Sequence, residues 1–215
     1  MKTPLRTSPI YDQLKQLNVS WREINGMQAV FTITGEDAKA ARLGIADLSF
    51  LSRFGVKGAG AAAWLNQDIP LPDRPNTWCP LPEGGLVARL GSSEFLVEDS
   101  LSNNVALRLA QYQQLPSKVY PTLRQDAAIA LSGEAVNELL LQTCSINFRA
   151  LSLAERPLVL TSMVGVSVII IPTERAGLPL YRIWCDGTYG AYLWHTLVAI
   201  AEELGGGVIG AKNVC

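Results

Sequence analysis

The sequence predicts an α+β protein with mostly antiparallel sheets, built from two similar halves. The first observation is a short apolar strand, a glycine and a helix within residues 54–65, where Gly58 separates strand from helix. The second is the same order within residues 129–142, where Gly133 takes that place. Glycine there lets the backbone turn where a Cβ would clash. The third is that each copy continues with a strand pair and a helix, so each half is strand–helix–strand–strand–helix.

We therefore expect a single domain over residues 1–215, made of two pseudo-repeats at about 19–116 and 123–215. An N-terminal arm and a short amphipathic helix occupy residues 1–18. Asn25-Gly26 predicts a tight hairpin after them, because both turn residues adopt positive φ.

Several further elements follow from periodicity and punctuation. Residues 69–83 hold five prolines, which exclude a helix and a central strand and predict an ordered surface loop. Residues 41–54 show little periodicity and are interpreted as a turn leading into a strand. The other predicted strands are at 86–90, 94–98, 158–163, 166–171 and 178–185, with a last edge strand within 208–215. The other predicted elements are a helical turn at 37–41, a capped helix at 101–115, a linker at 117–122, a hairpin turn at 172–177 and a helix at 188–204.

The bulk composition limits the classes of function. The net charge is −1 from 18 basic and 19 acidic residues, which gives no electrostatic case for nucleic acid or a membrane surface. No apolar stretch reaches the roughly 20 residues that span a bilayer, and no export signal begins the chain. The four cysteines form no CxxC pair, so we expect free thiols, no zinc site and a cytoplasmic location.

Acidic residues provide the first candidates for chemistry. Glu83, Glu94, Glu98 and Asp99 lie around the first hairpin, and a general acid or base among them would need burial and a raised pKa. A solvated hairpin with a helix cap is the better interpretation for Asp99, whereas Glu83 beside a glycine pair stays open. Asp47 is interpreted first as a turn residue that caps backbone amides.

The remaining candidates are weaker. His195 has only Cys185 near it in sequence as a nucleophile, and a surface or core histidine is the favoured interpretation. Aromatic residues are dense near the last strand and helix, where a flat-ligand pocket, an interface or plain core packing would each explain them. These aromatic residues are Trp184, Tyr189, Tyr192 and Trp194.

Several stretches resemble a known superfamily. RLGIADLSFLSRFGVKGAGAAAWL at 42–65 is similar to the signature of the aminomethyltransferase (glycine cleavage T-protein) folate-binding superfamily, and GGLVARLGSSEFLV at 84–97 resembles its next hairpin. In the second half, LSGEAVNELLLQTCSINF at 131–148, TSMVGVSVII at 161–170 and YRIWCDGTYGAYLWHTL at 181–197 resemble the gamma subunit of heterotetrameric sarcosine oxidase.

The resemblance implies two halves packed as one folate-binding-domain-like unit. The folate-dependent transferases carry two consecutive aspartates before a hairpin strand, the second being catalytic, and this sequence has Glu83-Gly84 there. We also expect no counterpart of the transferases' separate C-terminal domain. We therefore expect a scaffold that is not catalytic alone.

Three functional hypotheses follow. In the first, the chain is a non-catalytic gamma-like subunit that binds alpha- and beta-type sarcosine oxidase subunits through an apolar surface, or associates with itself. It would bind no cofactor alone, and the partner subunits would hold FAD, FMN, NAD and tetrahydrofolate. In the second, it binds tetrahydrofolate by itself in a pocket between the halves. In the third and least favoured, it catalyses one-carbon transfer. The residues expected to line the tetrahydrofolate pocket are Asp47, Glu83, Glu98, Arg182 and Trp184.

Overall fold

The chain contributes to two large β-sheets and passes between them more than once along its length. The structure is a computed structural model that describes residues 6–17 and 19–215. Most of the expected N-terminal arm therefore lies outside the described residues. So does Asn18, the last residue of the expected N-terminal helix. Unit 1 comprises Met1–Phe50, Asp126–Leu153 and Val159–Cys215, and unit 2 comprises Leu51–Gln125 and Ala154–Leu158.

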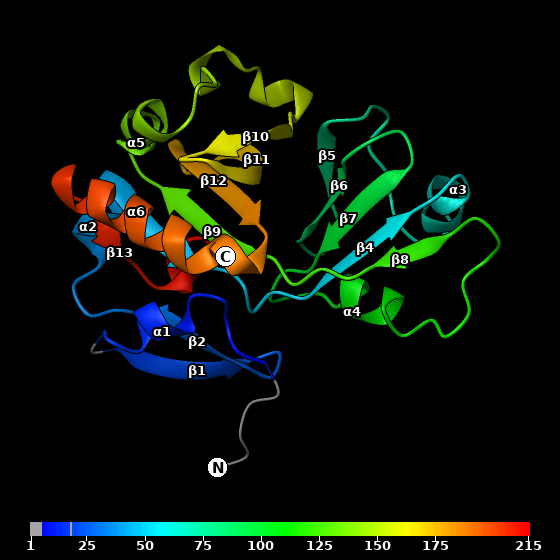
Figure 1. The fold of residues 1–215 in the computed structure, drawn as a ribbon, viewed down its shortest axis with the longest axis horizontal. Helices are drawn as coiled ribbons and strands as arrows, with labels where there is room; N and C mark the ends of the chain where they lie inside the picture. Colours follow the sequence, from blue (N-terminus) through cyan, green and yellow to red (C-terminus); the bar gives the residue numbers. More distant parts are fainter. Residues whose placement is uncertain (1–5, 18) are drawn as a thin grey trace. The chain divides into compact units, whose positions relative to one another are not determined.

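Unit 1 is built on a six-stranded sheet with the order β10-β11-β12-β9-β3-β13 (Figure 1). Every neighbouring pair is antiparallel except β3 and β13, so the predicted α+β class with mostly antiparallel sheets is confirmed. The strands are β3 (Gly44–Asp47), β9 (Ala127–Ser132), β10 (Val159–Met163), β11 (Val166–Arg175), β12 (Leu178–Cys185) and β13 (Gly207–Val208).

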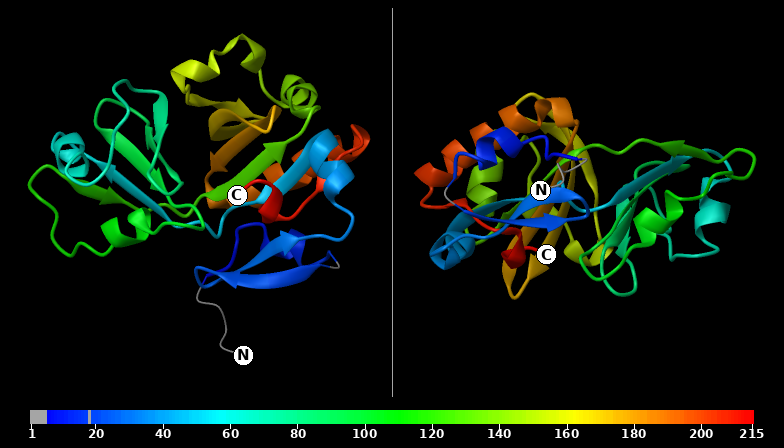
Figure 2. Two further views of the ribbon diagram at one scale, coloured as in Figure 1. Left: turned by 180° about the vertical axis from the view of Figure 1, so that it is seen from behind. Right: turned by 90° about the horizontal axis from the view of Figure 1, so that it is seen from below.

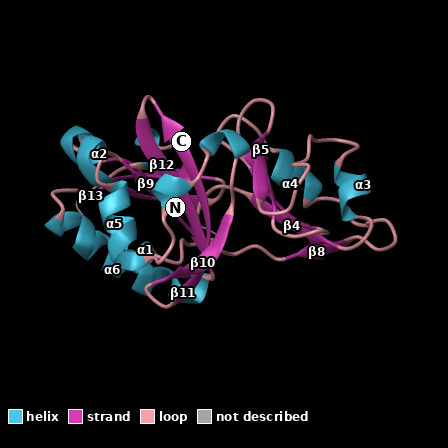
Figure 3. Cartoon of the chain, turned by 90° about the horizontal axis from the view of Figure 1, so that it is seen from above, coloured by secondary structure: helices cyan, strands magenta, loops and turns pink. Residues whose placement is uncertain are grey.

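Helices cover one side of this sheet (Figure 3). They are α2 (Asp37–Leu43), α5 (Val136–Thr143) and α6 (Gly190–Glu203). Side chains alternate between the two faces of a strand, so Ile129 and Leu131 of β9 point to the same face. Both belong to the unit 1 core, together with Leu139 of α5 and Leu193 of α6. Short 3₁₀ turns are η1 (Phe148–Ala150), η2 (Leu153–Glu155), η3 (Gly187–Tyr189) and η4 (Ala211–Asn213).

The N-terminal hairpin is the predicted one. Strands β1 (Ser20–Ile24) and β2 (Met27–Thr32) pair antiparallel, and Asn25 and Gly26 have φ of 51° and 72°. The short helix α1 (Tyr11–Leu14) lies beside this hairpin (Figure 2), with the Tyr11 and Trp21 ring centroids 5.4 Å apart.

A buried carboxylate ties this N-terminal region to the end of the chain. The Glu36 side chain is 7% exposed and accepts hydrogen bonds from the backbone N–H groups of Ile33 and Gly210. The contact joins residues 174 positions apart, so it fixes the hairpin against the segment after β13.

Unit 2 has a five-stranded antiparallel sheet with the order β5-β6-β7-β4-β8. Its own core includes Trp64, Phe95, Val97 and Leu109. The elements are β4 (Arg53–Lys57), α3 (Ala61–Leu65), β5 (Thr77–Pro80), β6 (Leu86–Arg89), β7 (Glu94–Glu98), α4 (Val105–Leu109) and β8 (Tyr120–Thr122).

The proline-rich segment is ordered through Arg89. The guanidinium donates hydrogen bonds to the carbonyls of Pro72, Asp73, Gly91 and Ser92, at 2.8–3.3 Å. Its carbon also lies 5.5 Å from the centroid of the Phe95 ring. One side chain thus anchors backbone that proline keeps out of regular pairing.

The structure corrects several element predictions. The predicted helix at 101–115 is only α4 (Val105–Leu109), because Ser100 and Asn103 form local side-chain hydrogen bonds that hold residues 100–103 in a turn. β3, β5 and β8 lie where a turn, a loop and a linker were predicted, since pairing with distant strands decides them. The predicted hairpin turn at 172–177 is shorter, because β11 runs to Arg175.

Whether residues 19–116 and 123–215 are structural repeats of one another stays a prediction. Among the described residues, no helix has the length and apolarity needed to cross a membrane.

Candidate functional site

Glu98 is fully buried and paired. It ends β7 opposite Arg53 of β4, and the Arg53 Nη1 and Glu98 Oε2 atoms are 3.1 Å apart. The two side chains are 1% and 0% exposed. The Glu98 carboxylate therefore already has a buried guanidinium as its hydrogen-bond partner, which is a structural role.

Asp99, which directly follows Glu98, is also buried. Burial of the Asp99 carboxyl raises its pKa above the ordinary value, and the backbone N–H donors of Ala106 and Leu107 partly oppose that rise. The same hydrogen bonds show what Asp99 does, since they satisfy the first amides of α4. The helix-cap part of the interpretation fits Asp99, but the expected solvation is wrong, because Asp99 is 1% exposed. The helix also begins later than predicted.

Glu83 lies in a turn whose backbone has positive φ. Its φ is 64°, and Gly84 and Gly85 follow with positive φ as well. Ser100 Oγ donates to the Glu83 carbonyl, and Asn103 Nδ2 donates to the Gly84 carbonyl. The backbone of this turn is therefore fastened, while the Glu83 side chain is exposed.

Asp47 acts as a turn residue. It is 5% exposed, and its Oδ1 accepts a hydrogen bond of 2.8 Å from the Ser49 backbone N–H. Ser49 Oγ in turn accepts from the Ala128 backbone N–H. This is the amide-capping role predicted for Asp47, and it connects the end of β3 to β9.

Arg182 and Trp184 come from the same strand and share a face of it. They flank Ile183 in β12, and Ile183 is in register with Ile129, which in turn is opposite Asp47. Strand alternation therefore puts Arg182 and Trp184 on one face of the sheet. Asp47 is in register with Ile183 and so belongs to the opposite face. Trp184 is 1% exposed.

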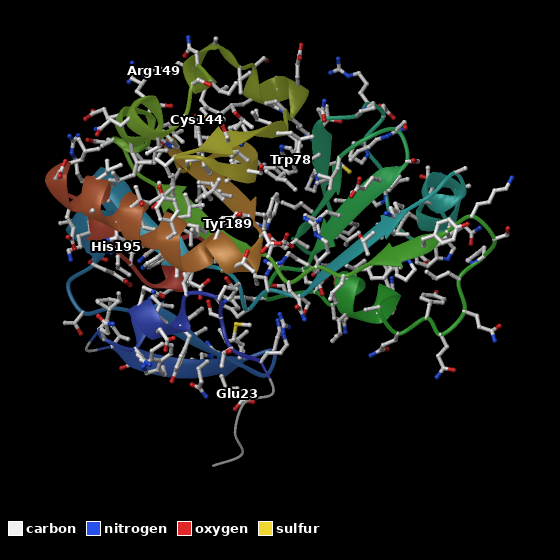
Figure 4. The ribbon with its side chains drawn as sticks, in the orientation of Figure 1. Glu23, Trp78, Cys144, Arg149, Tyr189 and His195 are labelled. Atoms are coloured by element: carbon white, nitrogen blue, oxygen red, sulfur yellow. The ribbon has the colours of Figure 1, made fainter. Side chains whose placement is uncertain are left out.

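Cys185 and His195, the candidate nucleophile and base, differ in exposure: Cys185 is buried and His195 is exposed. Burial, together with the carboxylates of Asp126 and Asp186, raises the pKa of Cys185 to about 12. Cys185 therefore stays a thiol near neutral pH, and the thiolate is the reactive form. His195 is an exposed residue of α6, the helix that Tyr189 immediately precedes (Figure 4).

The five residues proposed from the sequence are distributed over both units. Unit 1 contributes Asp47, Arg182 and Trp184, and unit 2 contributes Glu83 and Glu98. Sequence reasoning missed Arg53, whose role depends on pairing across 45 residues that no local pattern reports. Within the described ranges, no three His, Cys, Asp or Glu side chains group in a way that could hold a metal ion.

Sequence comparisons do not classify the chain. No family model matches it, and a search of curated proteins found no match.

Solved structures do match its fold. Glycine cleavage system aminomethyltransferase T from Bartonella henselae superposes with a TM-score of 0.74 at 14% identity over 97% of this chain. The alignment spans only 61% of the aminomethyltransferase chain. A chain of heterotetrameric sarcosine oxidase from Corynebacterium sp. U-96, in complex with pyrrole 2-carboxylate, superposes with a TM-score of 0.64 at 20% identity. That match covers 93% of this chain and 96% of the other, so the two chains are nearly equal in length.

At these identities the matches establish the fold alone. The predicted likeness to the T-protein superfamily and to sarcosine oxidase is confirmed at that level: the chain has the α+β fold shared by glycine cleavage aminomethyltransferase T and a chain of heterotetrameric sarcosine oxidase.

Proposed function

We propose that this chain is a non-catalytic, gamma-like subunit of a complex of the heterotetrameric sarcosine oxidase type, in sarcosine and one-carbon metabolism. The observation that carries the proposal is the two-way match to a sarcosine oxidase chain, over 93% of this chain and 96% of the other. The aminomethyltransferase extends well beyond the matched region, because only 61% of its length is aligned. A T-protein-like fold of this length therefore has a precedent within a multisubunit oxidase.

The acidic residues support a scaffold role. Glu83-Gly84 stands where the resembling transferases carry two aspartates, and Glu83 is exposed in a turn. The other nearby acids already have structural tasks, because Glu98 pairs with Arg53 and Asp99 caps α4. In this proposal the chain binds no cofactor alone, and alpha- and beta-type partners in the cytoplasm hold FAD, FMN, NAD and tetrahydrofolate.

The test is isolation of the tagged chain from its own cells at native expression level. We expect co-purifying chains that carry flavin, detected by absorbance after denaturation, and sarcosine-dependent oxygen consumption by the isolated complex. An untagged strain gives the background. Recovery of the tagged chain without flavin and without that activity would contradict the subunit role.

Binding of tetrahydrofolate by the chain itself is the second candidate. It is favoured by the superposition on an aminomethyltransferase over 97% of this chain, and by the presence of Arg182 and Trp184 on one face of β12. We propose these two residues, both of unit 1, as the contacts for the folate. An arginine and an indole would pair with the acidic and aromatic parts of a folate.

Tryptophan fluorescence tests the second candidate. Tetrahydrofolate should quench the purified chain saturably, and Trp184→Phe should remove most of the saturable part. Trp21→Phe, in the N-terminal hairpin, is the matched control and should retain it. Quenching that rises linearly with concentration, or that is equal in both variants, would rule out this site.

A further inference from the structure

Unit 1 contains a cavity of about 270 Å³ on a part of the fold that the proposed function does not use. It lies among α2, the end of β9, the turn between β11 and β12, and η4. Pockets for drug-sized ligands measure about 300–1,000 Å³, so this cavity suits a smaller molecule. Its lining includes Asp37, Ala40, Ser132, Arg175, Leu178 and Asn213.

Two opposite charges line this cavity without neutralising each other. Asp37 and Arg175 come from different elements, α2 and the end of β11. No Asp37 oxygen lies within 4 Å of an Arg175 nitrogen, and the Asp37 carboxylate forms no hydrogen bond or ion pair with any residue that the structure describes. A molecule that carries both charges would therefore find a partner for each.

The Arg175 guanidinium is both fixed and incompletely used. Its Nη1 donates to the main-chain oxygens of Asn213 and Cys215, at 3.4 and 2.5 Å. A guanidinium has five N–H donors in a planar fork, and only Nη1 donates to a residue that the structure describes, so Nε and Nη2 are the donors for a ligand carboxylate. Anchoring through Nη1 also reduces the side-chain entropy that a ligand contact would cost.

The rest of the lining is mainly apolar. Ala40 and Ala41 of α2 face the cavity together with Leu178 and Leu180 of β12. These side chains can cover a short aliphatic group but offer no hydrogen bonds to a sugar or a nucleobase. Shape and charge together restrict the ligand to a small body with one carboxylate, one ammonium and an apolar side chain.

We propose that this cavity binds a small zwitterionic amino acid with an aliphatic side chain. Asp37 receives the ammonium group, Arg175 receives the carboxylate, and the side chain lies against Ala40 and Leu178. The lining of the cavity includes none of the residues proposed to contact tetrahydrofolate, so this site is independent of tetrahydrofolate binding and of the subunit role.

Calorimetric titration of the purified chain with three probes of similar size tests the charge requirement. The probes are leucine, 4-methylpentanoate, which lacks the ammonium, and 3-methylbutylamine, which lacks the carboxylate. Saturable binding of leucine, about tenfold tighter than either singly charged probe, supports the proposal. No saturable heat with leucine, or equal affinities for all three probes, would overturn it.

Variants localise the binding. Asp37→Asn should weaken leucine about tenfold and leave the affinity for 4-methylpentanoate unchanged or higher. Ala40→Leu fills the cavity from the wall of α2 and should abolish binding of every probe. Glu174→Gln is the matched control, since Glu174 precedes Arg175 but does not line the cavity, and it should bind leucine like the wild type. Equal weakening by Asp37→Asn and Glu174→Gln would show a general charge effect and overturn the site.

Discussion

At the scale of single residues, the pair formed by Arg53 and Glu98 shows how a candidate active-site acid becomes a structural one. Both side chains are buried, and the register of β4 and β7 sets them opposite each other. Removing one partner of a buried ion pair leaves an uncompensated charge, which costs more than the intact pair contributes. The pair therefore constrains mutation at both positions.

We predict that Glu98→Gln and Arg53→Met each lower the free energy of unfolding by about 3–5 kcal/mol. The double variant should lose less free energy of unfolding than the two single variants combined, because it carries neither of the two charges. Urea unfolding followed by tryptophan fluorescence measures all three. Strict additivity of the two single losses would contradict an energetically coupled pair.

The thiol of Cys185 gives a prediction about reactivity and pH. Its pKa is raised from 9.0 to about 12 because burial and nearby carboxylates disfavour the thiolate. The native protein at about pH 8 should therefore label at the partly exposed Cys79 and Cys215, while Cys185 reacts only after unfolding. Mass spectrometry of the labelled chain identifies the sites. Rapid labelling of Cys185 in the native state would refute the predicted burial.

The raised pKa of Cys185 makes the folded state less stable as the pH rises above 9.0. The folded-state pKa lies above the unfolded value, so the contribution of Cys185 is fully present below pH 9.0. It is lost progressively as the pH rises towards 12. Cys185→Ala should show a smaller alkaline loss than the wild type in unfolding experiments over this range.

At the scale of elements, the turn from β9 to α5 depends on Gly133. Its φ is +108°, and a Cβ there would lie 2.7 Å from the Ala41 carbonyl oxygen. We predict that Gly133→Ala costs roughly 3 kcal/mol or more, because backbone strain adds to a clash with backbone that cannot move aside.

Gly165 provides the matched control for this prediction. Its φ is +84°, but nothing lies within 4 Å of an added Cβ. Gly165→Ala should therefore carry only the conformational cost of about 1–2 kcal/mol. Thermal unfolding compares the stability of the two variants. Equal losses of stability would show that the close approach at Gly133 does not destabilise the Gly133→Ala variant.

The proline-rich segment gives a second element-scale prediction. Arg89 holds the backbone of Pro72 and Asp73 through its guanidinium, which an alanine cannot replace. Arg89→Ala should accelerate amide hydrogen exchange in residues 73–79 and cost about 1–3 kcal/mol. Arg108→Ala, an exposed change on α4, is the control and should leave that exchange unchanged. Unaltered exchange in the Arg89 variant would mean that the segment is ordered by other contacts.

At the scale of the whole molecule, the proposed complex requires exposed apolar side chains to be covered by a partner. Leu123 is 83% exposed and Tyr120, in the edge strand β8, is 57% exposed. A few central apolar residues supply most of the affinity of an interface. We predict that Leu123→Asp reduces co-purification of flavin-bearing chains by about tenfold without changing thermal stability.

The control for this prediction is Gln125→Asp, which adds the same charge at another exposed position of unit 2. It should leave co-purification intact. If both variants retain their partners equally, the surface around Leu123 is not part of the interface. Loss of partners in both would indicate an effect of charge alone.

The sequence predicted elements whose signals are local. The Asn25-Gly26 hairpin and the strands on both sides of it follow from turn chemistry, which depends on neighbouring residues only. The helix α6 follows from apolar periodicity over a long segment. Asp47 was correctly interpreted as a turn residue, because an aspartate two positions before an amide can cap it unaided.

Other features were decided by contacts that no local pattern carries. β3 forms because β9 and β13 pair with it on both sides, although its four residues show no strand signal of their own. Glu98 pairs with Arg53 across the sheet, and Asp37 and Arg175, 138 positions apart, line one cavity.

By itself, then, the sequence determined the α+β class, most helices and hairpins, and the likeness to the T-protein fold. Only the tertiary structure decided which acids are paired, which thiol is protected and where a charged cavity opens. The physical reason is that turn and helix preferences are set within a few residues, whereas burial, pKa and pairing depend on what the folded chain brings near each side chain.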